Sequence, residues 1–303
     1  MTTDTVDRRI RLAEAAERYY VDGWSQDQVA AHLGTSRSNV SRLLETARSE
    51  GIVRFVIDHP LRRATVLEQA MRAHTADLDI RVLDRDSIDL VGRAGAAWLG
   101  ERLDGARRIA IGWGRTVATV IDHVSANDRH DVEVVQVGGD LTMAPAPSGH
   151  ELVRRLADAL GGSHRFLHAP AVVEDAATAR QLRAEPRIAA ELDRARQADV
   201  ALVGIGLPGQ GFAENAVAAP PQAAAVIAAR LIDDAGAEVT GPLRDRVIAI
   251  DLADLAAIPH VLGVAAGHEK GRAVAATARS GILDTLICDR AAALGSLDHW
   301  KET

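Results

Sequence analysis

The sequence predicts an α/β protein in which an N-terminal helix-turn-helix domain is followed by a doubly wound effector domain. The first sixty residues carry apolar side chains at helical spacing, interrupted by glycine. From residue 79 onward, short apolar runs alternate with amphipathic stretches, which is typical of parallel strands joined by helices. A length of 303 residues fits one small and one large domain.

The composition excludes several classes of protein. Apolar residues make up 47% and charged residues 25% of the chain, which is ordinary for a globular protein and argues against disorder. The longest segments without charge, 200–213 and 215–229, contain Gly or Pro and are shorter than the roughly 20 apolar residues of a membrane helix. The N-terminus lacks the apolar segment of a signal peptide. We therefore expect a cytoplasmic protein that does not enter a membrane.

No metal or cofactor is expected. The single cysteine, Cys288, excludes an internal disulfide and a zinc site built from cysteines. The histidines that lie near predicted elements show no metal-ligand spacing: His123, His150, His168 and His260. A dinucleotide site is disfavoured, because no G-x-G-x-x-G motif opens a helix after the first strand.

The net charge of −7 does not indicate a nucleic-acid-binding protein, so charge is informative only locally. The segment 36–54 carries four Arg against two Glu. Only two of the 35 basic residues are lysines, Lys270 and Lys301. Lysine is a compact point charge that arginine does not replace. Lys270 lies inside a glycine-rich turn. It either has a function there or is a lysine that occurs by chance on a solvated loop.

The N-terminal domain is predicted to hold three helices. The first covers 8–20, and its apolar positions are Ile10, Ala13, Ala16 and Tyr20. Ser25 is the expected cap of a short helix at 26–33, and Ser36 that of a third helix. The third helix has one apolar stripe, formed by Val40, Leu43, Leu44 and Ala47.

The spacing of small and apolar residues is that of a helix-turn-helix. Ala30 permits close helix packing, Gly34 makes the turn, and Val40 and Leu43 fill the shared core. The third helix would then be the recognition helix, with polar side chains suited to base edges and phosphates. The candidate DNA-binding residues are Ser36, Arg37, Ser38, Asn39, Ser41 and Arg42. The alternatives are a solvated helix, or a domain that binds a protein partner.

The predicted boundaries are 1–58 for the helix-turn-helix DNA-binding domain, 59–78 for a linker helix and 79–303 for the effector-binding α/β domain. Residues 52–57 could add a short wing strand, and the helix at 61–78 could link the domains and dimerise. Strands are predicted at 80–83, 108–111, 132–137, 164–167, 199–203, 246–250, 261–264 and 285–288. Helices are predicted at 90–102, 117–124, 151–160, 176–182, 187–197, 222–233 and 271–280.

Four predicted strands are each followed by a turn that contains glycine. Ligands bind at the carboxyl ends of strands in such folds, and backbone N–H groups at helix starts attract anions. Any single turn is also typical of an ordinary strand–helix junction, so the argument rests on the set of four. The candidate effector-binding residues are Gly112, Trp113, Gly114, Arg115 and Thr116; Gly138, Gly139 and Asp140; Gly204 and Gly206; and Gly267, His268 and Lys270. Arg115, Thr116 and Lys270 supply the donors that a phosphate or a polyol needs.

Several segments of the sequence together form a specific pattern: SQDQVAAHLG and VSRLL in the N-terminal part, and later GWGRT, VVQVGGD, LVGIGLPG, GPLRDRVIAIDLADL, IPHVLGVAAGHEK and LDTLICD. With these motifs the chain resembles the SorC-type sugar-binding transcriptional regulators over nearly its whole length. The resemblance implies a sugar-phosphate-isomerase-like effector domain that senses its ligand without converting it. It also implies double-stranded operator DNA and a small carbohydrate, in the first place a sugar phosphate, as partners, and a homo-tetramer or homodimer. Gly112, Gly114, Arg115 and Thr116 would form the loop for the phosphate or ring hydroxyls, and Lys270 would meet the anionic end.

The sequence departs from the family in three places. Gly138 stands where the family often has Asn. A Gly-Asp-Ile…Gly-Arg segment of the family appears here as AVIAAR at 225–230, in which two polar or flexible positions have become apolar. No lysine lies near the third strand, so no Schiff base is expected, and an unphosphorylated polyol is also compatible. The alternative function is a sugar-phosphate isomerase-like enzyme. The D-G-A-D-E motif of ribose-phosphate isomerases is absent, and only Asp140 and Glu214 are acids close to the predicted turns. We therefore expect a regulator and no enzyme.

Overall fold

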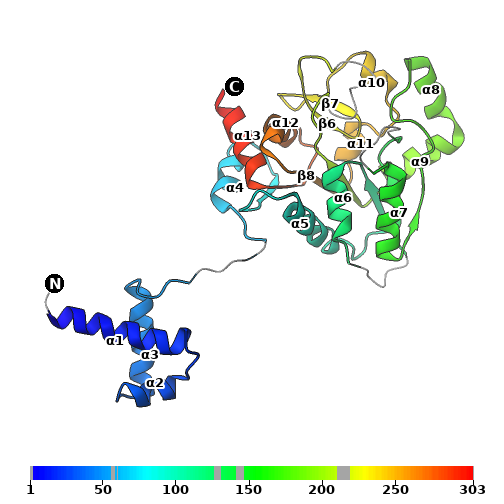
Figure 1. Cartoon of the computed structure of the whole chain (residues 1–303). Coiled ribbons are helices and arrows are strands. Elements are labelled where there is room, and N and C mark those ends of the chain that lie inside the picture. Colours follow the sequence, from blue (N-terminus) through cyan, green and yellow to red (C-terminus); the bar gives the residue numbers. More distant parts are fainter. Residues whose placement is uncertain are drawn as a thin grey trace. The chain divides into compact units, whose positions relative to one another are not determined.

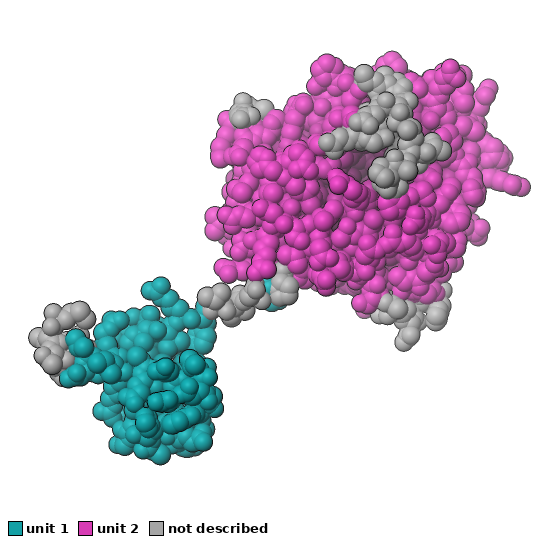
Figure 2. All heavy atoms as spheres, in the orientation of Figure 1, with its two compact units in different colours: residues 1–59 teal, residues 60–303 magenta. Residues whose placement is uncertain are grey.

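The computed structural model describes residues 3–55, 59, 61–125, 131–140, 147–209 and 219–302. The chain divides into two compact units, residues 1–59 and residues 60–303 (Figure 1, Figure 2). The segment expected to be a separate linker helix is mostly part of the second unit. Within it the helix is short, α4 (Thr65–Arg72), and it contacts both the first strand and the last helix of that unit.

The first unit contains the three predicted helices, α1 (Thr3–Tyr20), α2 (Gln26–His32) and α3 (Arg37–Ser49). Ser25 and Ser36 are the N-caps of α2 and α3, as expected from the sequence. Gly34 has φ +61°, the left-handed conformation that the inter-helix turn requires. The core is made of small and aliphatic side chains from all three helices: Leu12, Ala15, Ala16, Val29, Ala30, Val40, Leu44 and Ala47.

Two predictions for this unit differ from the structure. The buried face of α1 is centred on Leu12 and Ala15, whereas Ile10 is 58% exposed, because the face that meets α3 is rotated from the expected one. No strand forms at 52–55, and the rest of the expected wing, 56–57, lies outside the described residues. Phe55 instead packs edge-on against Tyr20, with ring centroids 5.1 Å apart.

The second unit is built on a seven-stranded parallel sheet with the order β1-β9-β8-β5-β2-β3-β4. Its strands are β1 (Asp79–Val82), β2 (Arg108–Ile111), β3 (Glu133–Gln136), β4 (Ser163–His164), β5 (Val200–Gly204), β8 (His260–Ala265) and β9 (Thr285–Cys288). The chain runs outward from β2 to β3 and β4 in one direction, and from β5 to β8 and β9 in the other. The topological switch point therefore lies between β2 and β5, and the predicted fold class is confirmed.

Helices cover both faces of the sheet. One apolar cluster joins the sheet to α5 (Ile88–Gly100), α6 (Arg115–Asp122) and α7 (Gly149–Leu160). The other joins it to α4, α8 (Ala176–Ala184), α9 (Pro186–Arg196), α11 (Leu252–Ala256), α12 (Gly271–Arg279) and α13 (Arg290–Glu302). The strands are apolar on both faces because each face is buried, which explains the continuous apolar runs in the sequence.

The helix predicted at 222–233 is wrong. This segment is a hairpin of β6 (Ala223–Ile227) and β7 (Arg230–Asp233), and its turn residues Ala228 and Ala229 have φ +48° and +68°. An alanine-rich run favours a helix locally, but here the segment is buried throughout and pairs with the chain after β5, through Gly206 and Val226. Local propensity is overridden by tertiary pairing.

The strand predicted at 246–250 is also wrong. Residues 242–246 form the short helix α10 (Pro242–Arg246), and the residues after it make only isolated bridges, Val247 with Val172 and Ala249 with Gly138. The strand expected at 164–167 is reduced to β4, at the edge of the sheet. In the part of the chain that is described, no helix is long and apolar enough to cross a membrane.

Candidate functional site

The candidate recognition helix α3 presents four exposed polar side chains on its first two turns: Arg37, Ser38, Ser41 and Arg42. The other two candidates have structural partners, and the Ser38 hydroxyl also lies 3.0 Å from the Ser36 hydroxyl. The Ser36 hydroxyl accepts the Asn39 N–H at 3.2 Å and so caps the helix. The Asn39 side-chain amide donates one N–H to the Thr35 hydroxyl at 2.8 Å, which leaves its second N–H and its oxygen available to a base edge.

The charge on this helix is uncompensated near its N-terminus. Among the described residues, neither Arg37 nor Arg42 makes an ion pair, whereas Glu50 at the far end pairs with Arg8 of α1 at 2.7 Å. Two guanidinium groups that are exposed and unpaired are available to phosphates and to guanine edges.

The glycine turns of the second unit lie at one edge of the sheet. β8, β5, β2 and β3 are neighbours and run parallel, so their carboxyl ends, and the turns that follow, meet at the same edge. The turns after β5 and β2 flank the switch point, where this class of fold binds ligands. The sequence-based grouping of these turns therefore corresponds to a grouping in space.

The turn after β2 opens helix α6. The Gly112 N–H donates to the Leu202 carbonyl of β5 at 2.9 Å. Gly114 is the N-cap residue with φ +127°, a conformation that residues with a Cβ rarely adopt. Arg115 is exposed and Thr116 half-buried at the first two positions of α6, and Trp113 packs partly into the core. The N–H groups of these first residues and the Arg115 guanidinium form an anion-attracting end.

The turn after β8 carries the lysine. Gly267 has φ +104°, and His268–Lys270 form a single 3₁₀ turn before α12. Burial lowers the pKa of Lys270, and the positive charge of Arg115 lowers it further, while Glu269 opposes the shift. Lys270 and Arg115 thus carry like charges on turns at the same edge of the sheet, and a bound anion would offset that repulsion. His268 is 66% exposed at its side chain and lies 3.9 Å from Asp298 of α13.

The turn after β5 joins the β2 turn to the hairpin. A Cβ on Gly204 would lie 3.2 Å from the Trp113 carbonyl oxygen. The Gly206 N–H donates to the Val226 carbonyl at 2.9 Å, and the Val226 N–H donates to the Gly206 carbonyl at 3.0 Å. The hairpin β6–β7 is therefore an additional wall of this edge, which the sequence-based prediction of a helix missed.

The turn after β3 has a structural explanation that requires no ligand. Gly138 pairs with Ala249, and the Gly139 N–H donates to the Ile248 carbonyl at 2.7 Å. The Asp140 carboxylate accepts the Gly149 N–H at 2.8 Å and so holds the start of α7. Glu214, the other acid considered near these turns, lies outside the described residues.

We expect Gly139→Ala to lower the free energy of unfolding by about 1–3 kcal/mol, because a Cβ at this position would lie 2.4 Å from the Pro170 carbonyl oxygen. The control is Gly100→Ala, at the end of α5, where a Cβ meets no atom within 4 Å and helix propensity improves. Urea denaturation of both variants measures the difference. Equal stability of the two variants would show that the β3 turn is not sterically closed.

In the described ranges, no group of three His, Cys, Asp or Glu side chains could hold a metal ion. Cys288 is fully buried in β9, and burial together with the nearby Asp289 raises the pKa of its thiol. Neither observation supplies a nucleophile or a metal centre at the sheet edge.

The fold and the sheet edge define a ligand-binding α/β domain that carries a helix-turn-helix unit. A family model described as "Putative sugar-binding domain" matches residues 59–297. The chain belongs to this sugar-binding domain family, and the resemblance to SorC-type sugar-binding transcriptional regulators is confirmed.

Known proteins are similar to this chain over more than nine tenths of its length. It is 26% identical over 293 residues to the deoxyribonucleoside regulator of Bacillus subtilis, covering 91% of this chain and 94% of that protein. It is 28% identical over 298 residues to the transcriptional regulator LsrR of Escherichia coli K12, covering 92% of each. The fold matches the full-length sorbitol operon regulator SorC from Klebsiella pneumoniae with a TM-score of 0.70 and 23% identity, covering 96% of this chain and 99% of that one.

Proposed function

We propose that the chain is a DNA-binding transcriptional regulator of carbohydrate metabolism, whose operator binding responds to a small carbohydrate bound at the carboxyl edge of the sheet. The observation that carries the proposal is the pairing of two features in one chain. A helix-turn-helix carries exposed arginines. In the sugar-binding-domain fold, Arg115 follows β2 beside the switch point, and Lys270 follows β8 at the same edge of the sheet. Its relatives with full-length similarity are transcriptional regulators, which favours a regulator over an enzyme.

The DNA contacts would come from the N-terminal half of α3. Arg37 and Arg42 would reach phosphates or guanine edges, and the hydroxyls of Ser38 and Ser41 would support them. Ser36 would act chiefly as the helix cap, and Asn39 would offer its side-chain oxygen and its remaining amide N–H. In a homodimer or homo-tetramer, two such helices would read half-sites about 34–36 Å apart or a multiple of that spacing.

The effector would be anionic at one end and rich in hydroxyls at the other. Arg115, Thr116, Lys270 and the N–H groups at the start of α6 would hold the anionic end, which favours a sugar phosphate over a neutral polyol. The turns at Gly112, Gly204 and Gly206 allow the ligand to approach the backbone closely. Binding of the ligand to one arrangement of the subunits would shift the population toward or away from the DNA-binding state.

A thermal-shift screen against sugars, polyols and their phosphates tests this assignment. A ligand at 100 times its dissociation constant should add about 2.7 kcal/mol to the stability of the folded state. Lys270→Met is expected to abolish most of this gain for a phosphorylated ligand, because the compact positive charge of the β8 turn is lost. Lys301→Met is the matched control, since Lys301 is 75% exposed on α13 and pairs only with Asp298 among the described residues. If both variants respond as the wild type does, Lys270 is not part of the site.

A further inference from the structure

The turn that carries Lys270 rests directly on the last helix, α13. Helix α13 contacts the turn through Gly295, where a Cβ would lie 2.5 Å from the His268 carbonyl oxygen. From the other side, a Cβ on Gly271 would lie 2.2 Å from the Gly295 carbonyl carbon. The two backbones are in contact with no side chain between them, so α13 and the turn cannot slide independently.

A buried carboxylate joins the same two elements. Asp289, between β9 and α13, is 3% exposed. Both of its oxygens accept the Gly267 N–H at 3.1 Å, and one also accepts the Ala292 N–H in the first turn of α13 at 2.9 Å. Burial raises the pKa of this carboxyl although the two N–H donors oppose that shift. A carboxylate that is desolvated and held by two backbone donors fixes the position of the donors as well.

The next residue, Arg290, is connected through Asp84 to the segment by which the chain enters the second unit. Arg290 donates to one Asp84 carboxylate oxygen at 3.2 Å, and the other Asp84 oxygen lies 3.3 Å from Arg62 Nε. Arg62 belongs to the junction segment, residues 61–64, which is where the chain enters the second unit from the first. The backbone makes the same connection: the Asp84 N–H donates to the Arg62 carbonyl at 2.8 Å, and the Leu83 N–H donates to the Cys288 carbonyl at 2.9 Å.

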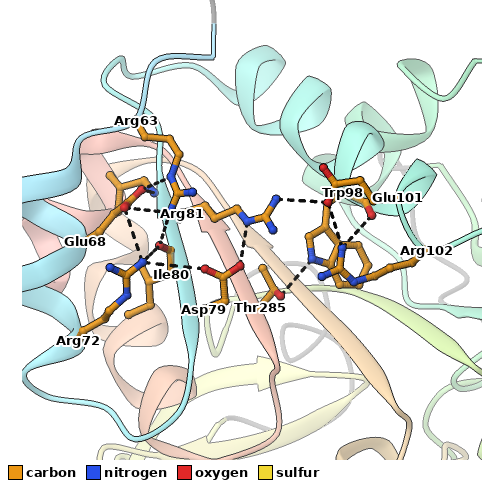
Figure 3. A network of polar contacts seen from close by, with 11 residues as sticks. Arg63, Glu68, Arg72, Asp79, Ile80, Arg81, Trp98, Glu101, Arg102 and Thr285 are labelled. Atoms are coloured by element: carbon orange, nitrogen blue, oxygen red, sulfur yellow. Dashed lines mark hydrogen bonds and ion pairs between the residues drawn. The ribbon is translucent and has the colours of Figure 1, made fainter.

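The junction segment is itself fixed to the sheet (Figure 3). Arg63 makes a two-pronged contact with Glu68 of α4, at 2.6 and 2.9 Å, and Glu68 also accepts the Val82 N–H of β1 at 3.0 Å. The Ala64 N–H donates to the Val82 carbonyl at 2.7 Å. If the end of β1 or β9 moves, residues 62–64 would therefore move with it.

We propose that Asp289 is a positioning residue that holds the Lys270 turn and, through Arg290 and Asp84, couples that turn to the junction segment. The regulatory part of the proposal rests on the proposed function, since it treats the Lys270 turn as the effector-binding turn. When an effector draws Lys270 and Arg115 together, Gly267 moves with the turn. Asp289 then shifts the start of α13, and the Asp84–Arg62 contact follows. Two consecutive residues make the contacts at the two ends of this path. Asp289 binds the turn, and Arg290 reaches the junction segment through Asp84.

Hydrogen–deuterium exchange of the full-length protein without any ligand tests the coupling. The reporter amides are Gly267 at the turn and Ala64 at the junction, each measured relative to Val203 in the central strand β5. Asp84→Asn, made at the junction end, is expected to speed exchange at Gly267 by about threefold or more. Asp289→Asn, made at the turn end, is expected to do the same at Ala64. The retained Asn oxygen can still accept from Ala292, so this variant should keep its fold.

Asp89→Asn is the matched control, because Asp89 also contacts an arginine and a second side chain, Arg93 at 2.9 Å and His123 at 2.7 Å, but lies on α5 away from this path. It should change neither reporter. If exchange at Gly267 is no faster in Asp84→Asn than in the Asp89→Asn control, the coupling is absent. If Asp289→Asn accelerates Val203 as much as Gly267, its role is general stability and the positioning role is overturned. Since no effector is used, these outcomes are independent of the thermal-shift screen that tests the proposed function.

Discussion

Glu68→Ala is expected to lower the free energy of unfolding of the second unit by about 3 kcal/mol. The Glu68 side chain is only 3% exposed and satisfies the Val82 N–H while it receives both prongs of Arg63 (Figure 3). Alanine would leave the Val82 N–H buried without this acceptor and would free the junction segment. Arg63 itself is 41% exposed and can turn to solvent, which limits the loss. Urea denaturation followed by circular dichroism measures the change.

Glu101→Ala is the control for this prediction. Glu101 also lies in the network of Figure 3, 3.3 Å from Arg102 and 3.8 Å from Arg81, but its side chain is 59% exposed. Exposed ion pairs contribute about 0–1 kcal/mol, so its removal should cost little. A loss at Glu68 no larger than the loss at Glu101 would mean that α4 is not held to β1 by this carboxylate.

Operator binding is expected to weaken by about 1–3 kcal/mol when Arg42 is replaced by Ala, and by more when Arg37 is replaced as well. Both side chains are exposed on the candidate recognition helix and, within the described residues, have no acidic partner that would be released by the change. Fluorescence anisotropy with the upstream DNA of the chain's own gene, over a series of salt concentrations, measures the affinity. The salt dependence should become shallower, because fewer counterions are released.

Arg93→Ala removes the same charge from α5 of the second unit, where Arg93 is 53% exposed and pairs with Asp89. It should leave operator affinity unchanged. Thermal-shift responses to the effector should be retained in the Arg37 and Arg42 variants, since the two units have separate cores. An Arg42→Ala protein that binds its operator like the Arg93→Ala protein would refute the assignment of α3 as the recognition helix.

Much of the fold could be predicted from local patterns. The serine caps at Ser25 and Ser36 mark helix starts because a side-chain oxygen must satisfy free N–H groups there. Strands β2 and β9 have the bounds expected from the sequence, because strands buried on both faces are short runs of apolar residues. The hairpin at 223–233 could not be predicted, since its conformation depends on the pairing of Val226 with Gly206. The last helix, α13, was not foreseen.

For the candidate site, the grouping of the glycine turns could be predicted, and the residues proposed to bind the effector stay a prediction. Arg115 and Lys270 could be selected because they follow strands in glycine-bearing turns, and strand order brings the two turns to one edge. The roles of Gly138 and Gly139 in backbone packing could not be seen, because the segments that press on them, Pro170 and Ile248, are distant in sequence. Asp289 was missed for a similar reason. An acidic residue directly after an apolar strand was visible, but its partner at Gly267 was not.

The junction segment also has a consequence for the edge of the sheet. Residues 62–64 lie antiparallel beside β1 and pair with backbone N–H and C=O groups on the outer side of that edge strand. Uncovered margins of this kind recruit strands from other molecules. A C-terminal fragment that starts at residue 79, where the sequence suggested a boundary, would lack residues 62–64, and we expect it to aggregate. A fragment started at residue 59 would retain them, and is the form in which the sugar-binding part is best isolated.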